Sequence, residues 1–271
     1  MSTPLAATDV LARNNVHVMG NPAGRPVVFA HGFGCSQEVW HNVAPHFVDD
    51  YRVVLFDHVG AGASDLSAYN RGKYDSLDGY ADDILEILEA LDLSDVVFVG
   101  HSVSAMMGVV ASVKDPTRFG KLILVGPSPR YVDQGEYEGG FSQADIDGLL
   151  DSLDANYLGW SATMGPIIAG NAERPEIGDE LTGLFCATDP TIARHFARVT
   201  FLSDNRSDLE QVTVPTVVLQ CSDDVIAPTV VGAYVHDHIA GSSLVQLAAT
   251  GHLPSLSAPQ ELTAVIRANL A

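Results

Sequence analysis

The segment FVGHSVSAMM, residues 98–107, decides the fold prediction. The segment begins at the end of one apolar run, passes through Gly100-His101-Ser102, and enters a second, longer run that continues beyond the segment and ends before Pro116. A short β-branched run, a turn of small and polar residues, and a longer apolar run predict a strand, a tight turn and a helix. The G-x-S-x-G elbow, which exposes a serine at the edge of a sheet, requires this context.

Ser104 stands where the elbow pattern has its second glycine. The turn is tight, so side chains two positions on either side of its serine face a neighbouring strand. Gly100 satisfies the first of these places, and Ser104 is small enough for the second. If Ser104 were the nucleophile, Met106 would occupy the crowded place. Ser102 is therefore the candidate nucleophile, although an isolated match of this kind is more often a structural turn.

Apolar runs like the one before the elbow recur along the chain. They lack polar alternation, so we interpret them as strands buried on both faces of a sheet. The runs are Val27–Ala30, Val53–Phe56, Val96–Val99, Leu122–Val125, Thr216–Leu219 and Leu244–Leu247.

Helical patterns lie between these runs. The segment Tyr80–Leu91 places Ile84, Leu85, Leu88 and Leu91 on one face. Its acidic residues are then expected to face mainly solvent, namely Asp82, Asp83, Glu86 and Glu89. Strands that alternate with helices predict an α/β fold with a mostly parallel sheet.

This alternation breaks between residues 128 and 203. Strand-like runs stop there, and helix-like pieces appear that contain Tyr157, Trp160, Met164, Phe185, Phe196 and Phe201. The simplest interpretation is a helical lid, 128–203, inserted into a core formed by 1–127 and 204–271. Ordinary long crossover helices are the alternative.

A serine nucleophile needs a base, and the base needs an acid that orients it. In elbow-containing folds the chain order is Ser, Asp or Glu, then His. The segment QCSDDVIAP supplies Asp223 and Asp224 after a late strand, and ATGHLPSLSAP supplies His252 after the last one. Only one of two adjacent aspartates can reach His252, and these residues alone favour neither.

An oxyanion hole is the remaining component of such a site. The segment FAHGFGCSQEVW places His31-Gly32-Phe33-Gly34 directly after an early strand. The N–H groups of Phe33 and of Val103, which follows the nucleophile, are the expected donors. A glycine turn without chemistry is the alternative, and the correct order of all four components argues against it.

Charge and composition limit the partners. The 271 residues carry 14 basic and 34 acidic side chains, a formal net charge of −20, which would repel nucleic acid and anionic membranes. The three cysteines, Cys35, Cys186 and Cys221, do not suggest a disulfide framework. No run approaches the roughly 18 apolar residues of a membrane span, and the N-terminus lacks a signal-peptide pattern. We expect a cytoplasmic protein. The HDH segment at His236–His238 has no matching ligands, so we expect no metal.

The segments quoted above, together with LFDHVGAGASD and GPSPRY, resemble the RsbQ-like α/β-hydrolases. That group contains the bacterial stress-response regulator RsbQ and the plant strigolactone and karrikin receptors. The resemblance covers nearly the whole chain. Serine at the place of Ser104 is usual in the group.

The resemblance implies a triad of Ser102, Asp224 and His252, with the Phe33 and Val103 amides as the oxyanion hole. It also implies an α/β-hydrolase fold, a four-helix lid over an apolar pocket, and no cofactor. Residues at the positions that line such a pocket are Phe33, Trp160, Phe185 and Phe201.

Three functions are consistent with these residues. The first is a serine hydrolase that cleaves small, neutral, apolar esters or lactones. The second is a slow-turnover signalling receptor or regulator that acts through a protein partner, as in a sigma-factor stress pathway. The third is cofactor-free perhydrolase or carbon–carbon bond hydrolase chemistry on the same fold.

Overall fold

A seven-stranded sheet forms the centre of the molecule. The structure is a computed structural model that describes residues 7–270. The strand order is β1-β3-β2-β4-β5-β6-β7; β1 pairs antiparallel with β3, and every other pairing is parallel. The α/β prediction with a mostly parallel sheet is confirmed. The strands are β1 (His17–Gly20), β2 (Pro26–Ala30), β3 (Arg52–Leu55), β4 (Val96–His101), β5 (Phe119–Val125), β6 (Thr216–Gln220) and β7 (Ser243–Gln246).

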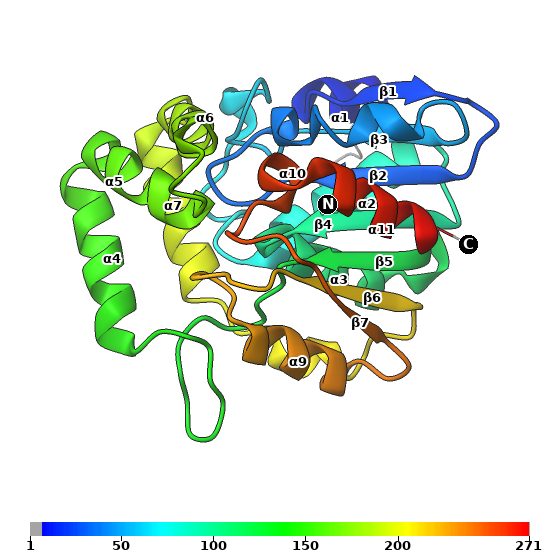
Figure 1. Cartoon of the computed structure of the whole chain (residues 1–271). Coiled ribbons are helices and arrows are strands. Elements are labelled where there is room, and N and C mark those ends of the chain that lie inside the picture. The colour runs from blue at the N-terminus through cyan, green and yellow to red at the C-terminus, as the bar shows by residue number, and fades with distance from the viewer. Residues whose placement is uncertain (1–6, 271) are drawn as a thin grey trace.

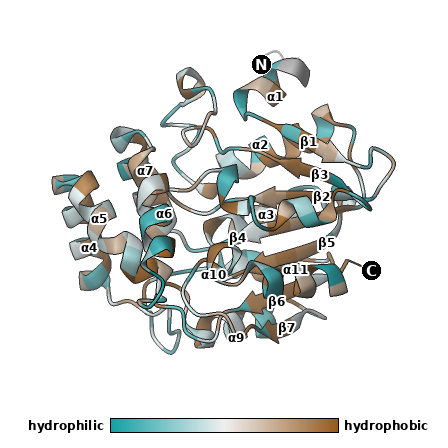
Figure 2. Ribbon diagram, turned by 45° about the horizontal axis from the view of Figure 1, so that its top comes forward, coloured by the Kyte–Doolittle hydropathy of each residue, from teal (hydrophilic) through white to brown (hydrophobic). Residues whose placement is uncertain are grey.

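Helices flank this sheet, and Figure 1 shows α11 crossing in front of it. The strands are mostly brown in Figure 2, whereas many helical surfaces are teal or white, as expected for a buried apolar sheet. The α-helices are α1 (Ala7–Arg13), α2 (Leu77–Ala90), α3 (Val103–Lys114), α4 (Gln143–Ala155), α5 (Tyr157–Ala169), α6 (Pro175–Cys186), α7 (Pro190–Phe201), α8 (Arg206–Leu209), α9 (Thr229–His238), α10 (Pro254–Ser257) and α11 (Pro259–Ala268). The 3₁₀ helices are η1 (Gln37–Trp40), η2 (Ala44–Phe47), η3 (Leu66–Ala68) and η4 (Pro116–Arg118).

Six of the strands coincide, within a few residues at each end, with the apolar runs of the sequence. The two outer strands depart from the prediction. The sequence did not indicate β1, and β7 is partly exposed rather than buried on both faces. Both strands lie at an edge of the sheet. Edge strands pair on one side only and face solvent, so they need no continuous apolar run.

Helix α2 starts earlier than predicted, because the Ser76 side chain accepts a hydrogen bond from the Asp78 N–H and caps it. The expectation that Asp83 faces solvent is wrong: its side chain is buried. The guanidinium of Arg13 lies 3.0 Å from it, and the ammonium of Lys73 lies 2.6 Å from it. These ion pairs with cations from two other segments offset the desolvation cost of burying the carboxylate.

The segment between β5 and β6 contains the long helices α4 to α7, then the short helix α8, and no strand of the sheet. Figure 1 shows α4 to α7 gathered beside one end of the sheet. Their inner faces join the same hydrophobic cluster as the strands, through residues such as Leu181 and Phe196. The lid boundaries at 128 and 203 stay a prediction. No helix within residues 7–270 has the length and apolar character needed to cross a membrane.

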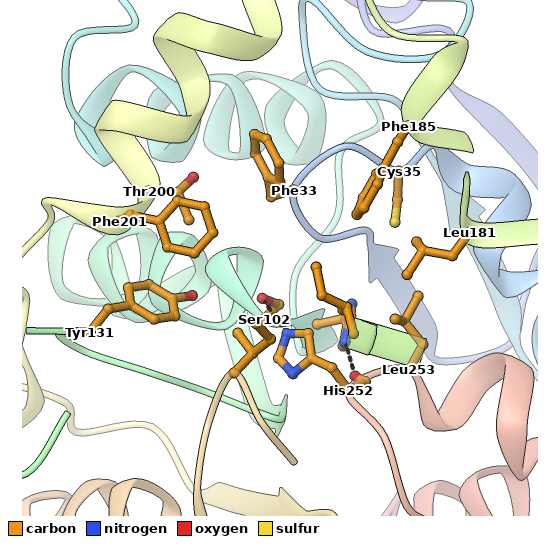
Figure 3. Close-up of a pocket in the computed structure, with 13 residues that line it drawn as sticks. Phe33, Cys35, Ser102, Tyr131, Leu181, Phe185, Thr200, Phe201, His252 and Leu253 are labelled. Atoms are coloured by element: carbon orange, nitrogen blue, oxygen red, sulfur yellow. Dashed lines mark hydrogen bonds between the residues drawn. The ribbon is translucent and has the colours of Figure 1, made fainter. Parts of the chain in front are cut away.

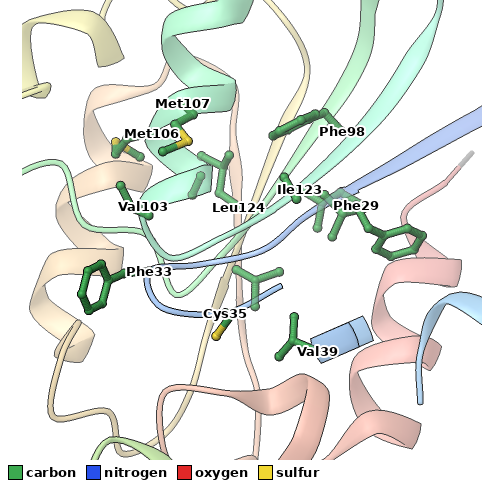
Figure 4. Packing of buried hydrophobic residues seen from close by; sticks show 14 of the residues in the cluster. Phe29, Phe33, Cys35, Val39, Phe98, Val103, Met106, Met107, Ile123 and Leu124 are labelled. Atoms are coloured by element: carbon green, nitrogen blue, oxygen red, sulfur yellow. The ribbon is translucent and has the colours of Figure 1, made fainter. Parts of the chain in front are cut away.

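Helix α3 packs tightly against the strand that precedes it. Its Met106 and Met107 belong to the same buried hydrophobic cluster as Phe98 of β4 and Leu124 of β5 (Figure 4). A Cβ atom at Gly108 would lie 2.5 Å from the Phe98 ring, so the absence of a side chain there allows close approach. This packing fixes the turn that joins β4 to α3.

Candidate active site

The turn between β4 and α3 presents Ser102 in a strained conformation. Its φ is +57° and its ψ is −124°, a region that costs a residue other than glycine about 1–3 kcal/mol. The Ser102 N–H donates to the carbonyl of Val125 at 2.8 Å, which holds the turn on the sheet. A Cβ at Gly100 would lie 2.5 Å from the backbone oxygen of Ser104, so the first elbow position requires glycine.

A chain of hydrogen bonds starts at this serine. The Ser102 Oγ lies 2.8 Å from Nε2 of His252, and Nδ1 of His252 lies 2.8 Å from Oδ2 of Asp224. A carboxylate only accepts, so Nδ1 carries the proton and Nε2 is free to accept the Ser102 hydroxyl proton. All three side chains are buried. The structure thus brings together three segments that are far apart in the sequence.

Asp224 is held as a carboxylate. Burial raises its pKa, but His252 and the backbone N–H groups of Ala227 and Ile226 outweigh burial, so the pKa lies below its ordinary value. Those N–H groups donate to Oδ1 at 3.0 and 2.9 Å. The neighbouring Asp223 is exposed and contacts the His252 loop only through its carbonyl, which accepts the Gly251 N–H at 2.7 Å. The geometry therefore separates two aspartates that the sequence left equivalent.

The two predicted oxyanion donors lie on the loop after β2 and at the start of α3. Within residues 7–270 neither the Phe33 N–H nor the Val103 N–H has a protein acceptor. Val103 is the first residue of its helix, where an N–H has no intrahelical partner. A Cβ at Gly32 would lie 3.1 Å from Cβ of Ser102, so this loop lies against the elbow. The role of both amides stays a prediction.

A small cavity of about 30 Å³ opens at Ser102 (Figure 3). On this measure a single water needs about 10–15 Å³, so any larger ligand requires the lining side chains to move. Three of the four predicted pocket residues line it, namely Phe33, Phe185 and Phe201. The full lining is Phe33, Cys35, His101, Ser102, Tyr131, Ile168, Leu181, Phe185, Thr200, Phe201, Ile226, His252 and Leu253.

Trp160, the fourth predicted pocket residue, does not line the cavity. Its indole is buried behind two residues that do: the ring centroids are 5.4 Å from Phe185 and 6.1 Å from Phe33. It also lines a groove between α4 and α5, on the outer side of these helices. Trp160 therefore supports the aromatic wall from behind.

Sequence reasoning missed several lining residues. Tyr131 is the last residue of the GPSPRY motif, and Cys35 follows the glycine loop, yet neither residue type signals a pocket. Burial raises the pKa of Tyr131, partly opposed by the nearby Ser102 hydroxyl, so its phenol stays protonated. Burial also raises the pKa of the Cys35 thiol to about 12, which makes it a poor nucleophile. The buried Thr200 hydroxyl has no partner within residues 7–270.

The lining contains no lysine, arginine, aspartate or glutamate. Three arginines of the predicted lid bond to groups outside the cavity: Arg130 pairs with Asp204 at 2.7 Å, and Arg198 pairs with Asp154. Arg174 donates to a backbone carbonyl of the 254–257 turn at 2.8 Å. In the described part of the chain, no group of three or more His, Cys, Asp or Glu side chains is placed to hold a metal ion.

His101, which precedes the candidate nucleophile, is buried as a neutral imidazole. Its Nε2 donates to the backbone carbonyl of His252 at 2.7 Å. Burial and the neighbouring His252 lower its pKa from 6.5 to about 3. The unfolded chain therefore binds a proton at His101 below about pH 6.5, whereas the folded chain does not.

This difference predicts acid sensitivity. Between pH 7.5 and pH 5, His101 alone should lower the free energy of unfolding by about 2 kcal/mol. Urea unfolding at both pH values measures this change, with His101→Gln as the control. The variant keeps a donor for the His252 carbonyl but has no side chain that titrates in this range. Its free energy of unfolding should therefore fall by about 2 kcal/mol less than that of the wild type. Equal losses in both proteins would contradict the prediction.

Comparisons with known proteins identify the family of the chain. The family model described as the alpha/beta hydrolase family matches residues 27–265. The chain is 40% identical to strigolactone esterase RMS3 of Pisum sativum, over 94% of this chain and 96% of that protein. It is 39% identical to karrikin insensitive 2 receptor CA of Petunia hybrida, over 93% and 94% of the two chains.

A solved structure extends this likeness to the whole fold. The hydrolase olei00960 from Oleispira antarctica superposes with a TM-score of 0.95 at 36% identity, covering 100% of this chain and 99% of that one. The resemblance to plant receptor-type hydrolases is confirmed by these matches. The chain therefore belongs to the alpha/beta hydrolase family, alongside relatives that are named as esterases, hydrolases and receptors.

Proposed function

We propose that the protein is a serine hydrolase that cleaves small, neutral esters or lactones with Ser102, His252 and Asp224. The observation that carries the proposal is the unbroken hydrogen-bonded chain from the Ser102 hydroxyl to a buried carboxylate, at the floor of an apolar cavity. Such a chain supplies a nucleophile, a general base and an orienting acid.

In the first half-reaction Ser102 Oγ attacks the substrate carbonyl carbon while its proton passes to Nε2 of His252. The carbonyl oxygen becomes an oxyanion, which the N–H groups of Phe33 and Val103 stabilise. When the tetrahedral intermediate collapses, the ester bond breaks and His252 returns the proton to the leaving alkoxide. Asp224 stabilises the imidazolium that forms between these two transfers.

In the second half-reaction water replaces the alcohol. His252 Nε2 takes a proton from the water, whose oxygen attacks the acyl carbon. The bond to Ser102 then breaks, and the same proton returns to Oγ. The products are an alcohol and a carboxylic acid, or a single hydroxy acid when the substrate is a lactone. Every proton that leaves an oxygen returns to another oxygen through His252, so no further reactant is needed.

The cavity sets the substrate class. Its wall is apolar and carries no formally charged side chain of the Lys, Arg, Asp or Glu type, so an anionic ligand finds no compensating cation there. The net charge of −20 adds long-range repulsion. Thr200 offers an unpartnered hydroxyl as a hydrogen-bond group for an oxygen of the ligand. Compact neutral molecules fit these properties best.

A panel of 4-nitrophenyl esters and small lactones tests this function. We expect kcat/KM to be highest for short neutral acyl groups and to fall by about 10-fold or more for a succinate half-ester of similar length. Rapid mixing should show a burst of nitrophenol if deacylation is slow. Highest activity on long-chain or anionic esters would contradict the proposed substrate class, and no turnover of any neutral ester or lactone would contradict the function.

Residues in the cavity wall should control acyl length. Phe185→Leu enlarges the cavity next to Ser102, so the ratio of kcat/KM for a butyrate ester to that for an acetate ester should rise by about 10-fold. Trp160→Phe is the matched control, because it shrinks a buried aromatic residue of the same cluster that lies behind the wall. The ratio should change less than about 2-fold in this variant. A larger change in Trp160→Phe than in Phe185→Leu would show that the cavity lies elsewhere when substrate is bound.

A slow-turnover receptor or regulator is a second candidate. It is favoured by relatives at 39–40% identity that are named receptors. In that function the same residues would hydrolyse a small molecule slowly, and a protein partner would bind the form of the protein that carries the ligand or its product. A kcat well below one per minute on every ester and lactone tested, with ligand-dependent changes in thermal unfolding, would favour this candidate over a metabolic hydrolase.

A further inference from the structure

Ser104, the residue at the unusual fifth place of the elbow, is fully buried, and its hydroxyl makes two hydrogen bonds to groups outside its helix, besides a weak contact with the Met107 sulfur within it. The Ser104 Oγ lies 2.6 Å from Nε2 of His58, and it donates to the backbone carbonyl of His31. A hydroxyl that donates to a carbonyl can accept a second bond, so it accepts the Nε2–H of His58. Ser104 therefore links the elbow helix to the loop that carries Phe33.

The hydrogen bonds of His31 and His58 determine which ring nitrogen of each carries the proton. Nε2 of His31 accepts the backbone N–H of His58 at 3.1 Å, so the Nδ1 of His31 carries the proton and donates to the Gly32 carbonyl at 2.9 Å. His58 carries its proton on Nε2, because that atom faces the His31 carbonyl at 3.2 Å as well as Ser104. Burial lowers the pKa of both imidazoles, which keeps them neutral.

These bonds hold both peptide groups that precede the Phe33 nitrogen. Ser104 and His58 hold the carbonyl of the His31–Gly32 peptide, and the His31 ring, with the more distant Cys35 N–H, holds the carbonyl of the Gly32–Phe33 peptide. A trans peptide is planar, with its C=O and N–H on opposite sides, and residues 7–270 contain no cis peptide. Fixing the Gly32 carbonyl therefore fixes the direction of the Phe33 N–H.

We propose that Ser104 is a positioning residue for the oxyanion hole: its hydroxyl, acting through His31 and His58, aims the Phe33 N–H at the oxyanion formed on Ser102. This inference rests on the proposed hydrolase function. The simpler explanation is that Ser104 only fills space where other elbows have glycine. That explanation does not account for two hydrogen bonds to groups outside the helix.

Kinetics of Ser104→Ala and Ser104→Gly on a short neutral ester test the proposal. Both variants remove the hydroxyl, so kcat should fall by about 10-fold with KM changed less than about 2-fold, because one fully lost oxyanion donor costs about 10²–10³-fold. Ser112→Ala is the matched control. Ser112 is a buried serine of the same helix whose Oγ donates to the Val109 carbonyl at 2.8 Å, away from the site. A kcat within 2-fold of wild type for Ser104→Gly would overturn the proposal.

A thionoester separates oxyanion positioning from a general structural effect. Its developing negative charge lies on sulfur, which accepts N–H hydrogen bonds poorly, so the oxyanion hole contributes less to its cleavage. The preference for the oxygen ester over the matched thionoester should therefore fall by about 10-fold in Ser104→Ala and stay unchanged in Ser112→Ala. An equal loss on both substrates would show that Ser104 supports the nucleophile or the fold instead, and would overturn the proposal.

Two further arms keep these outcomes distinct. If Ser104→Ala does not fold, Ser104→Cys replaces it, because a thiol is of similar size and a weak hydrogen-bond donor; the same fall in ester preference is expected. Ser102→Ala is measured in parallel. Retained turnover in Ser102→Ala would reject the proposed hydrolase, whereas an inactive Ser102→Ala with unchanged Ser104 variants would reject only the positioning role.

Discussion

Replacing Ser102 with alanine should lower kcat for a short neutral ester by about 10⁴-fold or more. The variant has no Oγ to form the acyl intermediate, and His252 has no hydroxyl to deprotonate. Some rate above that in water should remain, because the cavity and the Phe33 and Val103 amides still bind the substrate and its oxyanion. Steady-state hydrolysis, together with the absence of a nitrophenol burst, measures the loss.

The fold of Ser102→Ala should be intact. The Ser102 backbone N–H, which donates to Val125, is unaffected by the substitution, and the imidazole that loses the Ser102 hydroxyl is still held by Asp224. Alanine is as strained as serine at a φ of +57°, so the unfolding temperature should stay within a few degrees of wild type. A folded Ser102→Ala that keeps most of the wild-type turnover would refute the assignment of the nucleophile.

Asp224→Asn should lower kcat by about 10⁴-fold while KM changes little. The amide has nearly the shape of the carboxylate, but its nitrogen is a donor where the Nδ1–H of His252 needs an acceptor. The imidazole then favours the tautomer whose Nε2 carries a proton and cannot accept one from Ser102. The charge that stabilises the imidazolium is also lost. The kcat of the purified variant, with thermal unfolding as a folding check, measures the effect.

Asp223→Asn is the matched control for this variant. Asp223 is exposed, and its contact with the His252 loop is made by its backbone carbonyl, which the substitution leaves in place. Its kcat should lie within about 2-fold of wild type. The reverse order, with Asp223→Asn inactive and Asp224→Asn active, would show that the loop holds a different register in solution.

The buried strands and the elbow follow from local pattern. Buried strands need continuous apolar runs, so the five inner strands β2, β3, β4, β5 and β6 are visible in the sequence, whereas the edge strand β1 is not. Gly100 and Ser104 predict a tight turn because the crowding they relieve comes from the adjacent helix and strand. Chain order then makes Ser102 and His252 candidates without any structure.

The pocket could not be predicted in the same way. Whether an aromatic residue of the lid reaches the cavity depends on which face of its helix meets the sheet. Phe185 and Phe201 reach it, and Trp160, with the same apolar character, packs behind them. Tyr131 and Thr200 line the cavity from segments that carry no pocket motif. The sequence pattern likewise placed Asp83 toward solvent, whereas the folded chain buries it in ion pairs with Arg13 and Lys73.

The sequence by itself determined the α/β class, the elbow and the candidate nucleophile and base, because these depend on residues that are neighbours along the chain. Local spacing left three points open that tertiary structure decided: which of two adjacent aspartates faces His252, which aromatic residues line the cavity, and that the Ser104 hydroxyl reaches the His31 carbonyl. Each of these depends on the direction of a side chain relative to a segment distant in sequence. Packing of the whole chain sets that direction, and local spacing does not encode it.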